Sequence, residues 1–318
     1  MRGSITFCTA ITATLLLGCA KADNTKADST AGASAAAAPA EASARKLGET
    51  AGLKVPESVK YDADLDVYFI SNINGNPSQK DNNGFIVKVR ADSTGGAPIT
   101  LVQGGKGGVT LNAPKGIAIK GDTLYVADID AVRMFNKRTG ASLGSVDLRA
   151  QKATFLNDVA VGPDGIYVTD TGILFDAKGG MSHPGVNRIF RIAGKTVTEA
   201  AKGDSLGSPN GLTWDAANNR FVLAPFGANS VQTWAPGQAA PANMIAGPGQ
   251  YDGVEIVPAG ILVSSWADSA VHIIHGGTHM ATLVSNVSAP ADIGVDSKRN
   301  VLAIPRFNDG KVEYYSIP

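Results

Sequence analysis

Short stretches of alternating apolar and polar residues fill the chain after about residue 50, and none of them keeps a helical period over a long distance. β-branched and aromatic residues are common in these stretches, and Gly, Asp, Asn and Pro separate them. Runs of this kind between turn residues are typical of antiparallel strands. The clearest examples are the predicted strands 116–121, 123–129, 131–137, 141–148, 253–259, 261–267, 270–276 and 280–286. We therefore predict an all-β chain.

One motif recurs along the chain and opens each of six repeats. A leading residue, polar in five of the copies, is followed by a small or acidic residue and then by alternating aliphatic residues. The copies are VPESVKYD (55–62), APKGIAI (113–119), FLNDVAV (155–161), SPNGLTW (208–214), QYDGVEI (250–256) and APADIGV (289–295). The leading residue recurs every 39 to 58 residues, and a four-stranded propeller blade takes roughly 40 to 50 residues. The repeats therefore predict a six-bladed β-propeller with four-stranded blades.

The last repeat, 289–318, has room for only three strands. A propeller leaves only short, protected strand edges when its ring is closed. We therefore predict that the segment around Lys46–Lys54 supplies the outer strand of the sixth blade. This strand would join the two ends of the propeller without a disulfide.

The leading residues of the motif are expected to meet at the axis of the ring. These axial residues are Glu57, Lys115, Asn157, Asn210, Asp252 and Ala291. Four of them carry oxygen ligands, so we expect a divalent cation bound by Glu57, Asn157, Asn210 and Asp252. Ca²⁺ suits the all-oxygen set best, although Zn²⁺, Mn²⁺ or Mg²⁺ would also fit. The alternative is that each polar residue only caps its own strand.

Lys115 leaves further alternatives open. Its ammonium group would neutralise the neighbouring carboxylates and compete with the cation. Alternatively, the long side chain would carry the charge away from the axis or toward an oxygen of the substrate.

Two long insertions, 71–84 and 170–186, are expected on the same face as the axial residues, where they would form walls or a lid. His183 lies in the second insertion, where it would contact substrate, carry a proton or remain a solvated loop residue. Arg306, Trp266 and Phe226 are expected to rim the same mouth. Arg306 would bind a carboxylate or phosphate of the substrate, or form a salt bridge at the rim.

The front of the chain differs from the repeats. Residues 1–18 have the charged start and the short apolar run of a signal peptide, and Leu16-Leu17-Gly18-Cys19 resembles a bacterial lipobox. We expect cleavage before Cys19, lipidation of its thiol, a disordered Ala/Ser-rich tether over 19–45 and the propeller over 46–318. Because Ala20 follows Cys19, the anchor resembles those sorted to the outer membrane, facing the periplasm of a bacterial envelope.

Composition narrows the classes of function. After loss of Cys8 with the signal peptide and lipidation of Cys19, no free thiol would remain, which excludes cysteine catalysis. The 28 basic and 28 acidic residues balance, and no basic patch indicates nucleic acid. We expect a monomer that acts on a small molecule.

Several of these motifs resemble those of a known family. Over about residues 50–318 the chain resembles the senescence marker protein, gluconolactonase and regucalcin family of six-bladed propellers, and more distantly the paraoxonases. Glu57, Asn210 in Ser208-Pro209-Asn210-Gly211-Leu212 and Asp252 in Tyr251-Asp252-Gly253 stand where that family has metal ligands. Asn157-Asp158 stands where the family has a pair near metal and substrate.

The resemblance implies a metal-dependent hydrolase of a lactone or similar cyclic ester, such as a sugar derivative. It implies that Glu57 and Asn210 hold the ion, that Asp252 is the general base and that Asn157 positions substrate or water. Because propellers host many functions, two alternatives stay open. One is a non-catalytic propeller that binds a sugar, peptide or protein, and the other is a scaffold with a structural ion.

Overall fold

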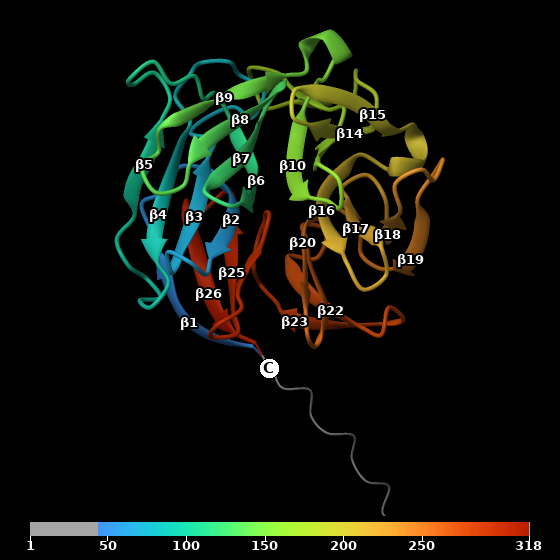
Figure 1. Ribbon diagram of the computed structural model, residues 1–318. Helices are drawn as coiled ribbons and strands as arrows, with labels where there is room; N and C mark the ends of the chain where they lie inside the picture. Colours follow the sequence, from blue (N-terminus) through green and yellow to red (C-terminus); the bar gives the residue numbers. More distant parts are fainter. Residues whose placement is uncertain (1–43, 318) are drawn as a thin grey trace, which may run out of the picture. The chain divides into compact units, whose positions relative to one another are not determined.

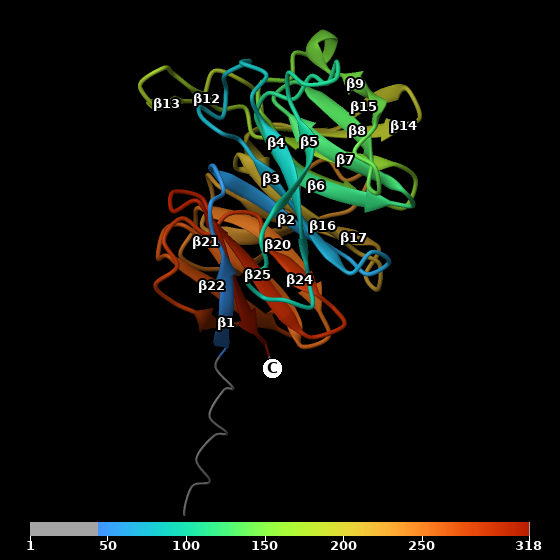
Figure 2. The same ribbon diagram turned by 90° about the vertical axis from the view of Figure 1, so that its left-hand side faces the viewer.

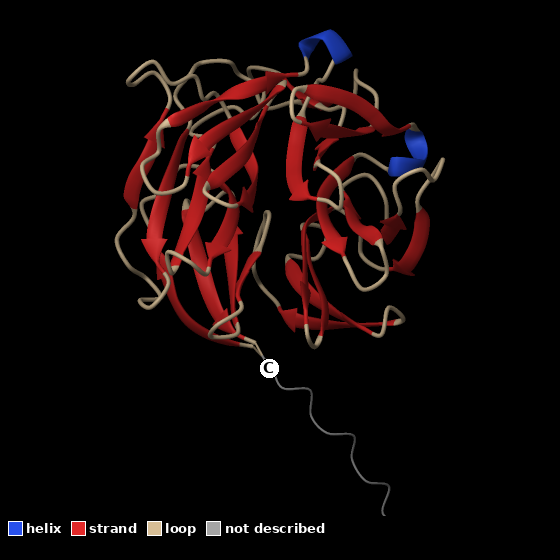
Figure 3. Cartoon of the chain, viewed as in Figure 1, coloured by secondary structure: helices blue, strands red, loops and turns tan. Residues whose placement is uncertain are grey.

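A computed structural model describes residues 44–317 of the chain. Six antiparallel sheets of four strands follow one another around a central axis, as Figure 1 shows. The helices in this part of the chain are two short 3₁₀ turns, η1 (Arg149–Gln151) and η2 (Asp204–Leu206), which stand out in blue in Figure 3. The predicted all-β, six-bladed propeller is therefore confirmed.

Each blade runs from an innermost to an outermost strand. Blade one contains β2 (Pro56–Asp62), β3 (Val67–Asn72), β4 (Phe85–Arg90) and β5 (Ile99–Gln103). Blade two contains β6 (Pro114–Lys120), β7 (Thr123–Asp128), β8 (Ala131–Asn136) and β9 (Ser142–Asp147). Blade three contains β10 (Leu156–Val161), β11 (Ile166–Asp170), β14 (Arg188–Ala193) and β15 (Thr196–Lys202).

The second half of the ring repeats this order. Blade four contains β16 (Pro209–Asp215), β17 (Arg220–Pro225), β18 (Ser230–Trp234) and β19 (Ala242–Ala246). Blade five contains β20 (Tyr251–Val257), β21 (Gly260–Ser265), β22 (Ala270–His275) and β23 (His279–Val284). Blade six contains β24 (Gly294–Asp296), β25 (Val301–Arg306), β26 (Lys311–Ser316) and β1 (Arg45–Thr50).

The ring closes as predicted, because β1 forms the outer strand of blade six. β1 pairs antiparallel with β26, and the two strands lie side by side in Figure 1, one blue and one red. At the axis, Val59 donates its backbone N–H to the Asp292 carbonyl at 3.1 Å, and Asp292 donates to the Glu57 carbonyl at 2.8 Å. Blades one and six are thus joined at both the outer and the inner edge.

Apolar side chains pack between neighbouring blades. Each of the six blade junctions within residues 44–317 holds its own cluster of buried apolar residues. Between blades three and four, Tyr167, Phe221 and Trp234 are buried, and the Tyr167 and Phe221 rings are 4.6 Å apart between centroids. The alternation of apolar and polar residues along the strands follows from this arrangement, since each blade packs against its neighbours.

The insertion of blade three forms a small hairpin of its own. Strands β12 (Leu174–Phe175) and β13 (Met181–Ser182) pair, and Figure 2 shows this hairpin projecting from the edge of the blades. The Asn76 side chain of the blade-one insertion donates to the Asp176 carbonyl at 2.6 Å, and the Phe175 N–H donates to the Ser78 hydroxyl at 3.0 Å. The two insertions are thus bonded to each other.

The expected signal peptide (1–18), Cys19 and nearly all of the expected tether lie outside the described residues. Within residues 44–317, the structure has no helix with the length and apolarity needed to cross a membrane.

Candidate active site

The innermost strands of blades one to five share an irregularity at their start. In each one, the pairing with the second strand slips within the first few residues, between Pro56 and Val59, Pro114 and Ile117, Leu156 and Val159, Pro209 and Gly211, and Tyr251 and Val254. Such a β-bulge re-aims the side chain at which it occurs. Five axial residues lie inside these bulges, which explains why the same sequence position faces the axis in successive blades.

Hydroxyl groups of the second strands hold the bulges in place. In blade three, the Asp158 N–H donates to Thr169 Oγ1 at 2.9 Å, and Thr169 Oγ1 donates in turn to the Asn210 carbonyl of blade four at 2.7 Å. Ser71 and Ser264 accept the corresponding N–H groups in blades one and five. These bonds fix the backbone beside the axial residues.

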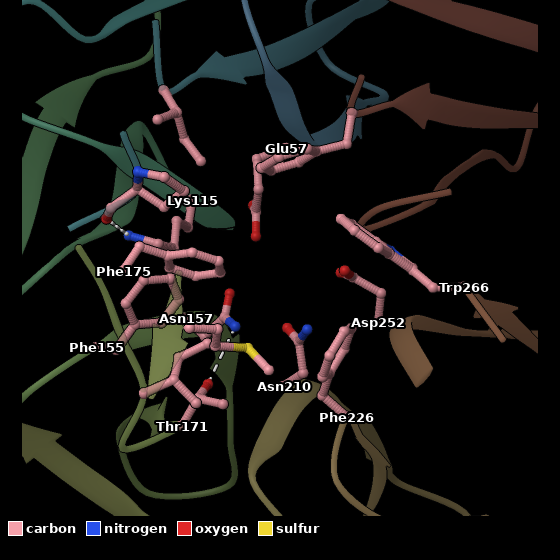
Figure 4. Close-up of a pocket in the computed structure, with 15 residues that line it drawn as sticks. Glu57, Lys115, Phe155, Asn157, Thr171, Phe175, Asn210, Phe226, Asp252 and Trp266 are labelled. Carbon is pink, nitrogen blue, oxygen red and sulfur yellow. Dashed lines mark hydrogen bonds between the residues drawn. The ribbon is translucent and has the colours of Figure 1, made fainter. Parts of the chain in front are cut away.

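The oxygen-bearing axial residues meet in one hollow. Figure 4 shows the side chains of Glu57, Asn157, Asn210 and Asp252 directed toward one another from four blades. They line a pocket with a volume of about 60 Å³, which leaves room for a cation and a few waters. Ala291, the sixth axial residue, is buried and does not belong to the lining.

Three of these side chains have an acceptor oxygen that no hydrogen-bond donor of the described residues contacts. Glu57 Oε2, Asn157 Oδ1 and Asp252 Oδ1 are buried and have no hydrogen-bond partner among residues 44–317. Buried polar atoms without partners are costly and call for an explanation. A bound cation would satisfy all three oxygens at once, so the residues present fit a metal ion.

The electrostatics of the pocket also favour a cation. Burial raises the pKa of Glu57 well above its ordinary range, and the Asp252 carboxylate adds to this rise while Lys115 opposes it. Burial likewise raises the pKa of Asp252, with a further contribution from Asp292. Two buried carboxylates cannot both ionise cheaply unless positive charge compensates them.

The donor set is mixed. Within residues 44–317, no three His, Cys, Asp or Glu side chains lie close enough to share a metal ion. The axial set offers only two carboxylates, Glu57 and Asp252, and adds the carboxamides of Asn157 and Asn210. Carboxylates with amide oxygens and water are typical ligands of calcium, whereas the borderline metals prefer nitrogen and sulfur.

Thr171, which no motif of the sequence marks, orients Asn157. The Thr171 hydroxyl donates to the Pro209 carbonyl at 2.8 Å, so its lone pairs accept from Asn157 Nδ2 at 3.0 Å. With its nitrogen held in this way, the Asn157 amide turns its oxygen toward the axis. The bond therefore decides that Asn157 offers an acceptor to the pocket.

Lys115 is buried in the same lining, but its charge is held at the side. Its Nζ donates to the carbonyls of Ala113 at 3.0 Å and Pro77 at 3.1 Å, and it lies 4.2 Å from the centre of the Phe155 ring. Burial lowers the pKa of Lys115 to about 8, although Glu57 opposes this change. The ammonium group thus ties the blade-one insertion to the pocket floor.

The walls of the pocket are apolar and follow a second repeat position. Phe226, Trp266 and Phe307 each come directly after the second strand of their blade. Each donates its backbone N–H at 2.9 to 3.1 Å to the residue two positions before the axial residue. Ile73 and Thr171 occupy the same place in blades one and three. This repeat position therefore marks the rim, where Phe226 and Trp266 were expected from the sequence.

Two residues proposed from the sequence lie outside the axial pocket. His183 Nε2 is 3.1 Å from the Thr171 carbonyl and 2.7 Å from the Asn187 amide, and it lines a neighbouring hollow. Arg306 donates to the Ser288 carbonyl at 3.1 Å and to Glu313 at 2.9 Å. It is the last residue of β25, so the next residue, Phe307, reaches the rim in its place.

A second polar register lies one residue deeper along the innermost strands, where the motif has Ser, Gly or Asp. Gly116 and Gly211 leave room for the neighbouring blade, since a Cβ on either would lie 2.2 Å from an atom of that blade. Asp158 instead accepts the Leu212 N–H of blade four at 2.8 Å, and Ser58 donates to Asp292 across the seam between blades one and six. Burial raises the pKa of Asp292 to about 6. This register joins the blades below the pocket.

The comparisons with known proteins concern the fold. The sequence matches no known family model and no curated protein. Among solved structures, one described as a candidate gluconolactonase matches with a TM-score of 0.63 and 17% identity, over 87% of this chain and 93% of the other. A gluconolactonase from Xanthomonas campestris, described as important in glucose secondary metabolic pathways, matches with a TM-score of 0.63 and 16% identity, over 86% and 90% of the two chains.

The chain has a gluconolactonase-like propeller fold. The expected resemblance is confirmed at this level, since identities of 16 to 17% speak for the fold alone. A chain of the nidogen/laminin complex also matches, with a TM-score of 0.53 and 20% identity over 70% of this chain and 76% of that one. The function therefore depends on the chemistry of the pocket.

Proposed function

We propose that this gluconolactonase-like propeller is a metal-dependent hydrolase of lactones or related cyclic esters. One observation carries the proposal: three buried, unpartnered oxygens, Glu57 Oε2, Asn157 Oδ1 and Asp252 Oδ1, line a single pocket in the described part of the chain. The apolar walls of this pocket suit an organic molecule. Glu57, Asn157, Asn210 and Asp252 would hold the cation, which we expect to be Ca²⁺.

Each residue has a role that follows from its place. A divalent cation supplies Lewis-acid polarisation of the substrate carbonyl when it is bound. Asp252 takes a proton from the attacking water, whose oxygen bonds to the carbonyl carbon. The bond between that carbon and the ring oxygen then breaks, the ring oxygen takes the proton that Asp252 holds, and a hydroxy acid leaves. Asn157, oriented by Thr171, positions substrate or water.

The second candidate is a non-catalytic propeller that binds a sugar, peptide or protein. The fold is also similar to that of a chain in the nidogen/laminin complex, which supports a binding propeller as the second candidate. The enclosed position of the acceptor oxygens supports the hydrolase, because a flat protein partner would not reach them. We further propose that lipid on Cys19 anchors the protein in a bacterial envelope, at the outer membrane facing the periplasm.

A panel of lactones and esters, assayed with Ca²⁺, with other divalent cations and with a chelator, tests the proposal. We expect metal-dependent hydrolysis, and at saturating Ca²⁺ we expect Asp252→Asn to lower kcat at least about 100-fold while the circular dichroism spectrum stays unchanged. Asp122→Asn changes an exposed turn residue and serves as the matched control. No hydrolysis with any cation would leave the binding module as the better account.

Calcium titration separates a catalytic from a merely structural ion. Ca²⁺ at 100 times its Kd is expected to stabilise the protein by about 2.7 kcal/mol, and Glu57→Gln should remove most of this stabilisation. Stabilisation without turnover would indicate a scaffold with a structural ion.

A further inference from the structure

The pocket has two chemically different zones. Apart from the indole N–H of Trp266, its polar side chains are the axial residues and Thr171 at the floor. The Thr171 hydroxyl is already engaged with Pro209 and Asn157, and the Lys115 ammonium with Ala113 and Pro77. Once the proposed cation occupies the axial oxygens, few polar side-chain groups therefore remain for hydroxyls on a substrate.

Aromatic rings form two facing walls above the floor. On one side, the Phe226 and Trp266 rings are 5.7 Å apart between centroids, and the Trp266 and Phe307 rings 5.3 Å. On the other side, the Phe155 and Phe175 rings are 5.8 Å apart. Figure 4 shows Phe155 and Phe175 across the hollow from Phe226 and Trp266. A flat or extended apolar group bound at the mouth would contact rings of both walls.

The β12–β13 hairpin covers this space with further apolar surface. Phe175 and Met181 of the hairpin belong to the lining, and Met181 is 56% exposed. The bonds from Asn76 to Asp176 and from Phe175 to Ser78 hold the hairpin against the blade-one insertion. An apolar group bound below it would bury this exposed surface.

We propose that the substrate carries a bulky alkyl or aryl substituent, which lies between the aromatic walls and under the hairpin, and that it is not a polyhydroxylated sugar lactone. This inference rests on the proposed hydrolase function. The physical reason is the free energy of burial. A buried hydroxyl without a hydrogen-bond partner loses its bonds to water, which is unfavourable, whereas the burial of an apolar group is favourable.

A series of δ-lactones tests the inference on the full-length protein with Ca²⁺. The series comprises glucono-δ-lactone and δ-lactones with a methyl, butyl or heptyl group beside the ring oxygen. We expect kcat/KM to rise about 3- to 4-fold per added methylene until the pocket is full. Glucono-δ-lactone should then be at least about 100-fold poorer than the best alkyl lactone. Equal or faster hydrolysis of glucono-δ-lactone would overturn the inference.

Binding without turnover separates this inference from the proposed function. A 2-alkylcyclopentanone has the carbonyl but no ester bond, and its binding can be followed by quenching of Trp266, with Trp266→Phe as the blank. Tighter binding of longer chains, without hydrolysis of any lactone, would retain the apolar pocket and reject the hydrolase. Hydrolysis at a rate that does not depend on chain length would retain the hydrolase and reject the apolar pocket. If the protein neither binds the ketones nor hydrolyses any lactone, both proposals are rejected.

Adjacent hairpin residues provide matched variants. Phe175→Ala and Met181→Ala should each lower kcat/KM for the heptyl lactone about 10-fold and change it less than about 3-fold for the methyl lactone. Leu174→Ala removes an exposed apolar side chain of the same hairpin that does not line the pocket, so it should change neither. The same loss in all three variants would contradict the proposed contact.

Discussion

Lys115 shows how one side chain serves both the architecture and the chemistry of the pocket. Its ammonium group holds the Pro77 carbonyl of the blade-one insertion, yet it lies close enough to oppose the rise in the pKa of Glu57. Of the alternatives that the sequence left open, the geometry favours a charge carried to the side of the axis. The Lys115 charge would repel a cation bound by the axial residues and would weaken its binding.

Replacing Lys115 with Met should therefore have two opposite effects. Without the neighbouring charge, the proposed Ca²⁺ site should bind roughly tenfold more tightly, as calorimetric titration would show. Without its two hydrogen bonds, the insertion should lose about 1 to 3 kcal/mol of stability. Lys80→Met, which removes a partly exposed lysine from the same insertion, is the control. An unchanged Kd in both variants would mean that Lys115 does not act on the cation.

At the scale of elements, Glu313 forms several of the side-chain contacts in blade six, where the ring closes. It lies on β26 and accepts from Lys46 of β1 at 2.8 Å, from Lys311 and Arg306 at 2.9 Å and from the Tyr315 hydroxyl at 2.9 Å. Burial alone would raise the pKa of Glu313, but the hydrogen bonds from Lys46, Lys311 and Tyr315 lower it to about 2.

This lowered pKa predicts a pH-dependent contribution to stability. The ionised Glu313 stabilises the fold fully above its unfolded pKa of about 4.3, and this stabilisation is lost as the pH falls toward 2. Glu313→Gln should therefore cost about 1 to 3 kcal/mol at pH 7 and almost nothing near pH 2, in urea unfolding at several pH values. Glu49→Gln, at a more exposed position that contacts the same lysines, should cost much less. A cost that is independent of pH would rule out the ionic explanation.

At the scale of the whole molecule, the propeller depends on a strand from the far end of the chain. β1 covers the edge of β26, and Thr50 Oγ1 lies 3.0 Å from the Tyr314 hydroxyl between the two strands. Without β1, that edge would expose unpaired backbone groups, which destabilise the blade and promote aggregation.

Shortened chains test this closure. A chain of residues 51–318 should melt at a lower temperature and aggregate, in calorimetry and size-exclusion chromatography, whereas a chain of residues 44–318 should retain the stability of the full protein. A synthetic peptide of residues 44–52 should restore the shorter chain, because it can pair with the open edge. Equal melting temperatures for the two chains would show that blade six is stable with three strands.

The axial residues show how much of the site the sequence alone predicts. Glu57, Asn157, Asn210 and Asp252 were expected at one point because they share a repeat position, and the bulges bring that position to the axis in each blade. The rim was predicted in part, since Phe226 and Trp266 line the pocket as expected. Arg306 was expected there, but the rim position lies one residue later, at Phe307.

The sequence predicts the number of blades, the inner strands and the closing strand. Alternating residues and turn residues are local features, and six copies of the repeat show the same features. Tertiary structure alone decided that Phe155, Phe175 and Met181 join the lining, and it alone decided the direction of Lys115 and the orientation of the Asn157 amide. These depend on contacts between blades, such as the bonds that Thr171 makes to Asn157 and Pro209. No local pattern of residues encodes contacts between segments so far apart in the chain.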